Sequence, residues 1–160
     1  MLTVNIICVG SLKESYWREA VAEYAKRLGG FCKFSVAEVD ECRLPKSYSD
    51  ADLSRVIRTE GERILDKIPS GSFVVAMCIE GKELSSPELA GRLAKIAVGG
   101  KSRVDFVIGG SYGLSESVKK RADLRLSMSP MTFPHQLARV MLCEQIYRAF
   151  SLSSATKYPP

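Results

Sequence analysis

Short apolar runs rich in β-branched residues recur along the chain. They alternate with longer segments in which apolar residues return every three or four positions. Apolar runs of about four to eight residues are typical of buried strands, and the wider spacing is typical of amphipathic helices. We expect strands at residues 2–9, 31–39, 73–79, 104–108 and 124–128. We expect helices at residues 11–28, 50–68, 86–98, 115–122 and 134–152.

Glycine and proline mark the ends of several of these elements. Gly10 closes the first strand, Gly29 follows the first helix and Pro69 follows the second. Strands that alternate with helices of this length imply crossover connections. The predicted fold is therefore α/β, with a mostly parallel sheet and helices on both faces. Ligands in such sheets bind beyond the carboxyl ends of the strands.

Two loops leave from such strand ends. Residues 108–114 read IGGSYGL, and residues 126–136 read LSMSPMTFPHQ. Glycines at a strand-to-helix turn permit positive φ and a close approach of the backbone to a ligand. We therefore expect the two loops to hold a small ligand, while a tight connection without a ligand is the alternative interpretation of the first loop.

Familiar nucleotide-binding motifs do not fit these loops. The glycine turn is not G-x-G-x-x-G, and it lies late in the chain instead of after the first strand. Residues 99–102 read GGKS, but position 95 is lysine where a P-loop has its first glycine, and the segment precedes a strand. A Rossmann dinucleotide site and a P-loop are both disfavoured.

Length and composition limit the class of protein. The chain has 160 residues, of which 46% are hydrophobic, so we expect a single domain over residues 1–160. No apolar run reaches the roughly 18 residues of a membrane span, and residues 1–10 do not resemble a signal peptide. We expect a cytoplasmic protein without a membrane partner. The five cysteines form no C-x-x-C pair, so we expect neither disulfides nor a metal site.

The charge of the chain is compatible with a polyanionic partner. The formal net charge is +5 and the pI is about 9.0. Many basic residues stand next to acidic ones, as Arg18 does with Glu19 and Lys67 with Asp66, a pattern typical of solvated helix faces. Charge alone does not decide whether the protein binds RNA.

The last predicted helix carries candidate catalytic side chains. His135, the only histidine, lies at its start, with Thr132 as the predicted N-cap. A helix N-terminus favours neutral imidazole, which suits a proton acceptor, although a structural role is the commoner one for a lone histidine. Arg139 lies on the apolar face, where its charge must reach a carboxylate, a phosphate or a subunit interface unless the side chain snorkels to the rim. The polar side of this helix is narrow and is formed by Glu144, Gln145 and Arg148, which suggests burial from two sides and a homodimer interface.

Several stretches resemble a known family. They are residues 9–13, 16–17, 60–65, 81–86, 106–114, 129–136 and 139–150. The most specific read FVIGGS-x-GL, S-x-MTFPHQ and RV-x-L-x-EQ-x-YRAF. Over nearly its whole length the chain is similar to the large-subunit ribosomal RNA methyltransferase H family, small members of the SPOUT class of knotted methyltransferases.

The resemblance implies a fold, an assembly and a cofactor. It implies a C-terminal trefoil knot over about residues 104–160, a homodimer, and S-adenosylmethionine bound in the knot. By position, the cofactor contacts of the family fall on Met77, Gly109, Met128, Ser129, Pro130, Met131, Thr132 and Phe133.

The resemblance also implies a reaction, methylation of N3 of a pseudouridine in 23S rRNA on the assembled ribosome. The ribosome and its large-subunit rRNA are then the expected partners. Such a transfer needs an aligned acceptor nitrogen and the loss of its proton, but neither a metal nor a protein nucleophile. We expect His135 to act as base and Arg139 as an anion-stabilising or phosphate-binding group, with Tyr158 as a third candidate catalytic residue.

The tail departs from the family pattern. The family usually ends in a basic and glycine-containing segment followed by Tyr-His and a basic residue, whereas residues 154–160 read SATKYPP. Tyr158 is kept, but prolines replace the histidine and the terminal base. Two alternatives follow: a non-catalytic ribosome-binding or RNA-binding dimer that keeps the fold, and a knotted methyltransferase that acts on another RNA such as tRNA.

Overall fold

Five parallel strands form one sheet in the computed structural model, which describes residues 1–154. The strands are β1 (Thr3–Val9), β2 (Lys33–Val39), β3 (Phe73–Glu83), β4 (Arg103–Ile108) and β5 (Leu124–Ser127). Their order across the sheet is β2-β1-β4-β3-β5, and every pairing is parallel. The predicted α/β class is confirmed, and the sheet is parallel throughout the described residues.

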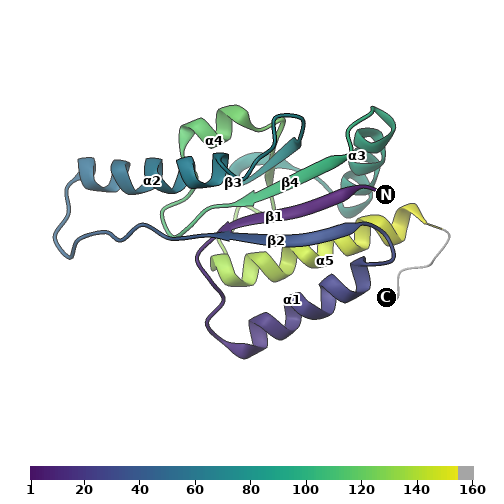
Figure 1. Cartoon of the computed structure of the whole chain (residues 1–160), viewed down its shortest axis with the longest axis horizontal. Helices are drawn as coiled ribbons and strands as arrows, with labels where there is room; N and C mark the ends of the chain where they lie inside the picture. Colours follow the sequence, from purple (N-terminus) through teal and green to yellow (C-terminus); the bar gives the residue numbers. More distant parts are fainter. Residues whose placement is uncertain (155–160) are drawn as a thin grey trace.

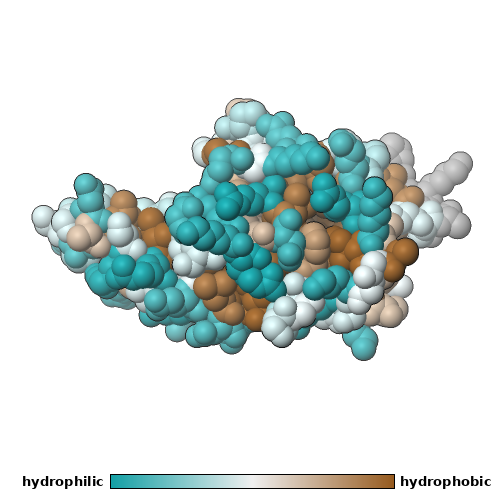
Figure 2. Space-filling view, turned by 90° about the horizontal axis from the view of Figure 1, so that it is seen from above, coloured by the Kyte–Doolittle hydropathy of each residue, from teal (hydrophilic) through white to brown (hydrophobic). Residues whose placement is uncertain are grey.

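Helices cover both faces of this sheet (Figure 1). They are α1 (Ser15–Leu28), α2 (Asp50–Leu65), α3 (Ser86–Val98), α4 (Glu116–Arg121) and α5 (His135–Ser153). Helices α1, α3 and α5 pack on one face, and α2 and α4 pack on the other. Figure 2 looks down on the side that α2 and α4 cover, which is largely hydrophilic with smaller apolar areas.

The central strands are apolar because both of their faces are covered. In β1, Ile6 packs with the α5 layer while the next residue, Ile7, packs with the α2 layer. In β4, Phe106 and Val107 divide between the two layers in the same way. Successive side chains of a strand point to opposite faces, so a sheet buried on both sides requires nearly continuous apolar runs.

Two predicted boundaries differ from the structure by four residues, and the others differ by three or fewer. The first helix begins at Ser15 instead of residue 11, and the third strand continues to Glu83 instead of ending at residue 79. The extension is polar, which hid it from the apolar pattern. It is also irregular, because Met77 and Lys82 both pair with Leu126. A Cβ at Gly81 would lie 2.8 Å from the carbonyl carbon of Arg125, so this close approach of β3 to β5 requires glycine.

Local signals account for the starts of α2 and α3. Ser49 and Asp52 form a capping box at α2, and Ser85 and Glu88 form one at α3. The predicted starts at residues 50 and 86 are confirmed. Among the described residues, no helix combines the length and the apolar character that crossing a membrane requires.

Candidate active site

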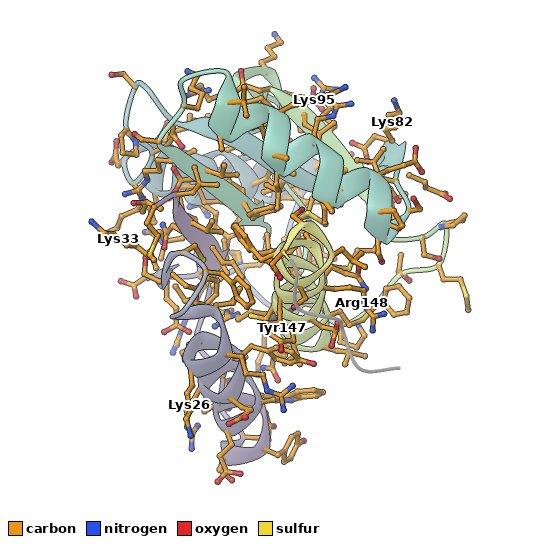
Figure 3. The ribbon with its side chains drawn as sticks, turned by 90° about the vertical axis from the view of Figure 1, so that its right-hand side faces the viewer. Lys26, Lys33, Lys82, Lys95, Tyr147 and Arg148 are labelled. Carbon is orange, nitrogen blue, oxygen red and sulfur yellow. The ribbon has the colours of Figure 1, made fainter. Side chains whose placement is uncertain are left out.

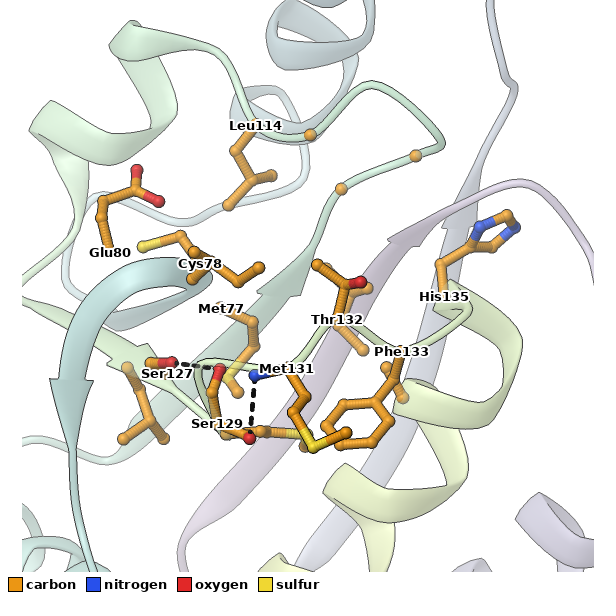
Figure 4. A pocket seen from close by; sticks show the side chains of 18 of the residues that line it. Met77, Cys78, Glu80, Leu114, Ser127, Ser129, Met131, Thr132, Phe133 and His135 are labelled. Carbon is orange, nitrogen blue, oxygen red and sulfur yellow. Dashed lines mark hydrogen bonds between the residues drawn. The ribbon is translucent and has the colours of Figure 1, made fainter.

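A cavity of about 380 Å³ lies at the carboxyl ends of β3, β4 and β5 (Figure 4). We call it the central cavity. Its walls come from the turn that follows β4, the loop that follows β5, the first turn of α5, residues 77–80 of β3 and Lys119 of α4. Cavities of roughly 300–1,000 Å³ are typical of small-molecule sites.

Most of the expected cofactor contacts line this cavity. They are Met77, Gly109, Met128, Ser129, Met131, Thr132 and Phe133. Pro130 is exposed and does not line it. Residues far apart in the sequence therefore meet at one place, as the position of both loops at strand ends indicated.

The turn after β4 is tight. Gly113 has a φ of +87° and donates its backbone N–H to the carbonyl oxygen of Gly110 over 3.1 Å. A Cβ at Gly109 would lie 2.7 Å from the carbonyl carbon of Gly113. The connection is therefore tight, which both interpretations of this loop allow. The same turn lines the central cavity, so a ligand-binding role stays a prediction alongside it.

The loop after β5 is held by its own serines. Ser127 Oγ donates to the carbonyl oxygen of Ser129 over 3.1 Å, and the backbone N–H of Met131 donates to Ser129 Oγ over 3.0 Å (Figure 4). These bonds hold the loop through the Met131 backbone and do not involve its side chain. Met131 is 72% exposed. A large apolar side chain exposed at the edge of a cavity is available to a ligand or a partner.

His135 lies where two cavities meet. It is the first residue of α5, and it lines both the central cavity and a neighbouring one of about 790 Å³. Thr132 does not cap α5, because Pro134 occupies the N-cap position and provides no side-chain hydrogen bond; that prediction was wrong. We call the second space the charged cavity. Its charged lining residues are Lys13, Glu38, Asp40, Glu41, Arg43 and Arg63.

Arg139 is bound to a carboxylate. Its side chain is 2% exposed, it donates from Nη1 to Glu38 Oε2 over 2.6 Å, and it donates from Nη2 to the carbonyl oxygen of Gly10 over 3.2 Å. The carboxylate alternative is thus confirmed, and the snorkelling alternative is wrong. Arg139 joins α5 to the carboxyl ends of β1 and β2, directly beside the charged cavity.

Glu60 is a buried carboxylate that the sequence interpretation missed. It is 4% exposed, and Oε2 accepts the backbone N–H of Cys42 over 2.9 Å. Oε1 lies 3.0 Å from where a Cβ of Gly110 would stand and has no hydrogen-bond partner among the described residues. Burial, the largest cause, raises the pKa of Glu60, while the Cys42 N–H acts in the opposite direction.

A signal for Glu60 was present in the sequence. It stands four residues after Val56 and four before Ile64, both of which are buried on α2. Helical spacing puts these three side chains on one face, so a charge there marked an unusual buried group.

An ion pair lines the central cavity at the end away from His135. Lys119 Nζ on α4 lies 2.5 Å from Glu80 Oε1 on β3. Figure 4 shows Glu80 beside Cys78, with His135 on the opposite side of the cavity. The hydrogen bond between Lys119 and Glu80 is the largest cause of a lowered pKa at Glu80 and of a raised pKa at Lys119. The sequence did not single out this pair, because Glu80 lies beyond the predicted strand and Lys119 belongs to a short run of basic residues.

Tyr158 and the altered tail from residue 155 onward lie outside the described residues. Ser154, the last described residue, donates its hydroxyl to the carbonyl oxygen of Ser151 over 3.1 Å.

Comparison with known proteins relates the whole chain to one family. A family described as "Predicted SPOUT methyltransferase" matches residues 2–158. The ribosomal RNA large subunit methyltransferase H of Limosilactobacillus reuteri is 50% identical over 157 residues, which cover 98% of this chain and 99% of that protein. The proteins of the same name from Lactiplantibacillus plantarum and Oenococcus oeni are 48% and 46% identical, with coverage of 98% and 99% of this chain and 99% of each relative.

A solved structure supports the fold. A probable methylase family protein from Haemophilus influenzae superimposes with a TM-score of 0.53 at 15% identity, covering 98% of this chain and 72% of that chain. At this identity the similarity concerns the fold alone.

Proposed function

Because this chain belongs to the ribosomal RNA large subunit methyltransferase H family of SPOUT methyltransferases, we propose that it methylates large-subunit rRNA with S-adenosylmethionine as methyl donor. The proposed acceptor is N3 of a pseudouridine on the assembled ribosome, in the cytoplasm. The observation that carries this conclusion is the central cavity, which all the expected cofactor contacts except Pro130 line together.

The central cavity fits such a cofactor in size and lining. Its volume of about 380 Å³ lies within the range of small-molecule sites. Met77, Met128 and Phe133 provide apolar walls, and the glycine turn leaves its backbone accessible without side chains. When bound, S-adenosylmethionine supplies a methyl group on a sulfonium, so a protein nucleophile is not needed.

We assign the charged cavity to the acceptor nucleotide. Lys13, Arg43 and Arg63 line it, and basic side chains are the usual partners of RNA phosphates. His135 stands on the edge that it shares with the central cavity. An imide nitrogen must lose its proton in order to accept a methyl group. His135 is placed to take that proton, directly or through one water.

Arg139 then acts through its neighbours. Its guanidinium is bound to Glu38 and Gly10, so the expected direct contact with a phosphate gives way to a positioning role. By joining the start of α5 to the ends of β1 and β2, it holds His135 beside the charged cavity. Tyr158 remains the third candidate catalytic residue.

We also propose a homodimer formed through the outer flank of α5. Figure 3 shows α5 between α1 and α3, with Tyr147 directed toward α1. Half-buried apolar residues nevertheless remain on its surface, including Leu137, Val140 and Met141. Sedimentation velocity should give about twice the chain mass of 17.6 kDa. A monomer at micromolar concentration would contradict the dimer.

A knot over residues 104–160 within a single domain completes this proposal. A crystal structure of the cofactor complex is the direct test. The backbone after β4 should pass through the loop that the preceding chain forms. A backbone that lies entirely on one side of that loop would contradict the knot.

Methyl transfer to ribosomes tests the function. The protein is incubated with tritiated S-adenosylmethionine and with ribosomes, free large subunits or tRNA from cells that lack the modification. Label in the rRNA of assembled ribosomes is the expected result. Saturable cofactor binding without transfer would instead support the non-catalytic RNA-binding dimer, which the altered residues 154–160 favour.

Two other outcomes are also distinguishable. Label confined to tRNA would support a knotted methyltransferase with a different acceptor. Failure to bind S-adenosylmethionine at all would contradict every enzymatic interpretation.

A further inference from the structure

The ion pair between Glu80 and Lys119 is a charged group set into an otherwise neutral wall. Among the described residues that line the central cavity, Glu80 is the only acidic side chain, and Lys119 is the only basic side chain besides His135. Their side chains come from different elements, β3 and α4, and meet over 2.5 Å. Lys119 is only 17% exposed, whereas Glu80 is 52% exposed and lies closer to solvent.

The lysine is held in this place from several sides. Glu116 lies 3.9 Å from its Nζ on the same helix, and Arg125 Nε donates over 3.3 Å to the backbone carbonyl oxygen of Lys119. The bond from Arg125 ties the helix to β5, which borders the central cavity. Lys119 therefore has a second acidic neighbour besides Glu80, and its backbone is tied to β5.

A ligand with two opposite charges matches this wall. S-adenosylmethionine carries an ammonium and a carboxylate on one carbon at one end and an adenosine at the other. Charges that leave water need partners of opposite sign. Glu80 and Lys119 offer one partner of each sign side by side, so both charges of an amino-acid group can be paired without leaving either protein charge alone.

We propose, on the basis of the proposed use of S-adenosylmethionine, that Glu80 and Lys119 form the subsite for its amino-acid group. Lys119 binds the carboxylate, and Glu80 binds the ammonium. The pair lies at the opposite end of the cavity from His135 (Figure 4), which leaves the apolar walls and the glycine turn for the adenosine. Binding exchanges one ion pair within the protein for two between protein and ligand.

Two ligands that contain a thioether distinguish the contribution of this subsite to binding from that of the rest of the pocket. S-adenosylhomocysteine and methylthioadenosine share the adenosine and an uncharged sulfur, but methylthioadenosine lacks the amino-acid group. Isothermal titration calorimetry measures the affinity of each for the wild-type protein, Lys119→Met, Glu80→Gln and Lys120→Met. Lys120 is an exposed lysine on the same helix that does not line the central cavity, so its variant is the matched control.

Lys119→Met should weaken S-adenosylhomocysteine binding about tenfold to a hundredfold, the loss expected for a charge-assisted hydrogen bond. Glu80→Gln should weaken it about threefold to tenfold, because Glu80 is more exposed. Binding of methylthioadenosine should change less than twofold in both variants, and Lys120→Met should match the wild type with both ligands.

Methylthioadenosine binding also reports that each variant is folded. Equal losses for the two ligands, or no loss for either in Lys119→Met, would overturn the subsite. If the wild-type protein binds neither ligand, the proposed function fails with it. If it binds both equally well, only the subsite fails.

Discussion

At the scale of single residues, Gly109 has the least room for a side chain among the glycines that line the central cavity. A Cβ there would stand 2.7 Å from the carbonyl carbon of Gly113. Gly109→Ala should therefore lower the free energy of unfolding by roughly 1–3 kcal/mol. It should also weaken S-adenosylhomocysteine binding, because the turn must open to admit the methyl group. Urea unfolding and calorimetry measure the two effects.

Gly91 provides the matched control. It lies inside α3, and a Cβ there would meet no atom within 4 Å. Gly91→Ala should raise the free energy of unfolding by about 0.5–1 kcal/mol, through helix propensity, and leave ligand affinity unchanged. Unaltered binding in Gly109→Ala would contradict the placement of the cofactor beside this turn.

The ion pair of Arg139 and Glu38 should respond unequally to removal of its two partners. Glu38→Ala leaves a guanidinium that is almost fully buried with the Gly10 carbonyl as its remaining partner, which should cost about 2–3 kcal/mol. Arg139→Met removes the buried charge and leaves Glu38, which is 42% exposed, to be hydrated. That variant should cost about 1 kcal/mol or less. Urea unfolding that ranks Arg139→Met as the more damaging change would contradict this interpretation.

Residue types explain which site residues could be foreseen. Gly109 and the residues around Ser129 were prominent because they follow strands in loops with unusual composition. Glu80 and Lys119 were not, because a charged residue in a polar segment usually lies in solvent. Their proximity depends on how β3 and α4 are arranged in space, which no local pattern contains. Glu60 is the intermediate case, since its place among the apolar residues of α2 was a usable signal.

At the scale of elements, Glu60 fastens α2 to the segment that follows β2. Its carboxylate accepts the N–H of Cys42 and lies against the glycine turn, so α2 contacts two of the connections that border the charged cavity. Burial raises its pKa above the ordinary value of 4.5. An acid with a raised pKa binds its proton more tightly in the folded state. Stability is therefore lost as the pH rises through the window between 4.5 and the folded-state pKa.

Glu60→Gln should remove this pH dependence, because the amide does not ionise. The stability of the variant relative to wild type should increase as the pH rises from about 4.5 and level off once Glu60 is ionised. Urea unfolding at a series of pH values from acidic to neutral measures the difference in the free energy of unfolding. The contributions of the other titrating groups are the same in both proteins and cancel in this difference. A difference that is constant or that falls with pH would show that burial does not control this carboxylate.

The elements themselves were largely predictable. Apolar runs located every strand, and the predicted starts of α2 and α3 coincide with capping boxes that begin at Ser49 and Ser85. The errors have physical causes. The extension of β3 to Glu83 is polar because it leaves the layered core, so the apolar pattern missed it. The N-cap of α5 is Pro134, two residues after the predicted cap at Thr132.

At the scale of the whole molecule, the strand order places the chemistry. The order β2-β1-β4-β3-β5 sets the carboxyl end of β4 between those of β1 and β3. The turn after β4 therefore borders both the central and the charged cavity, with Ser111 and His135 common to the two. This order was not contained in the periodicity of the chain, because long-range pairing depends on contacts that single segments do not encode. The resemblance to the family, and not the pattern, suggested a knot.

Mass spectrometry of rRNA nucleosides identifies the methylated atom directly. Ribosomes that lack the modification are incubated with the protein and with S-adenosylmethionine carrying a deuterated methyl group, and the large-subunit rRNA is digested to nucleosides. We predict a deuterated methyl group on N3 of a pseudouridine, and its loss in Gly109→Ala. Label on another nucleoside, or no label although the wild-type protein binds the cofactor, would contradict the proposed function.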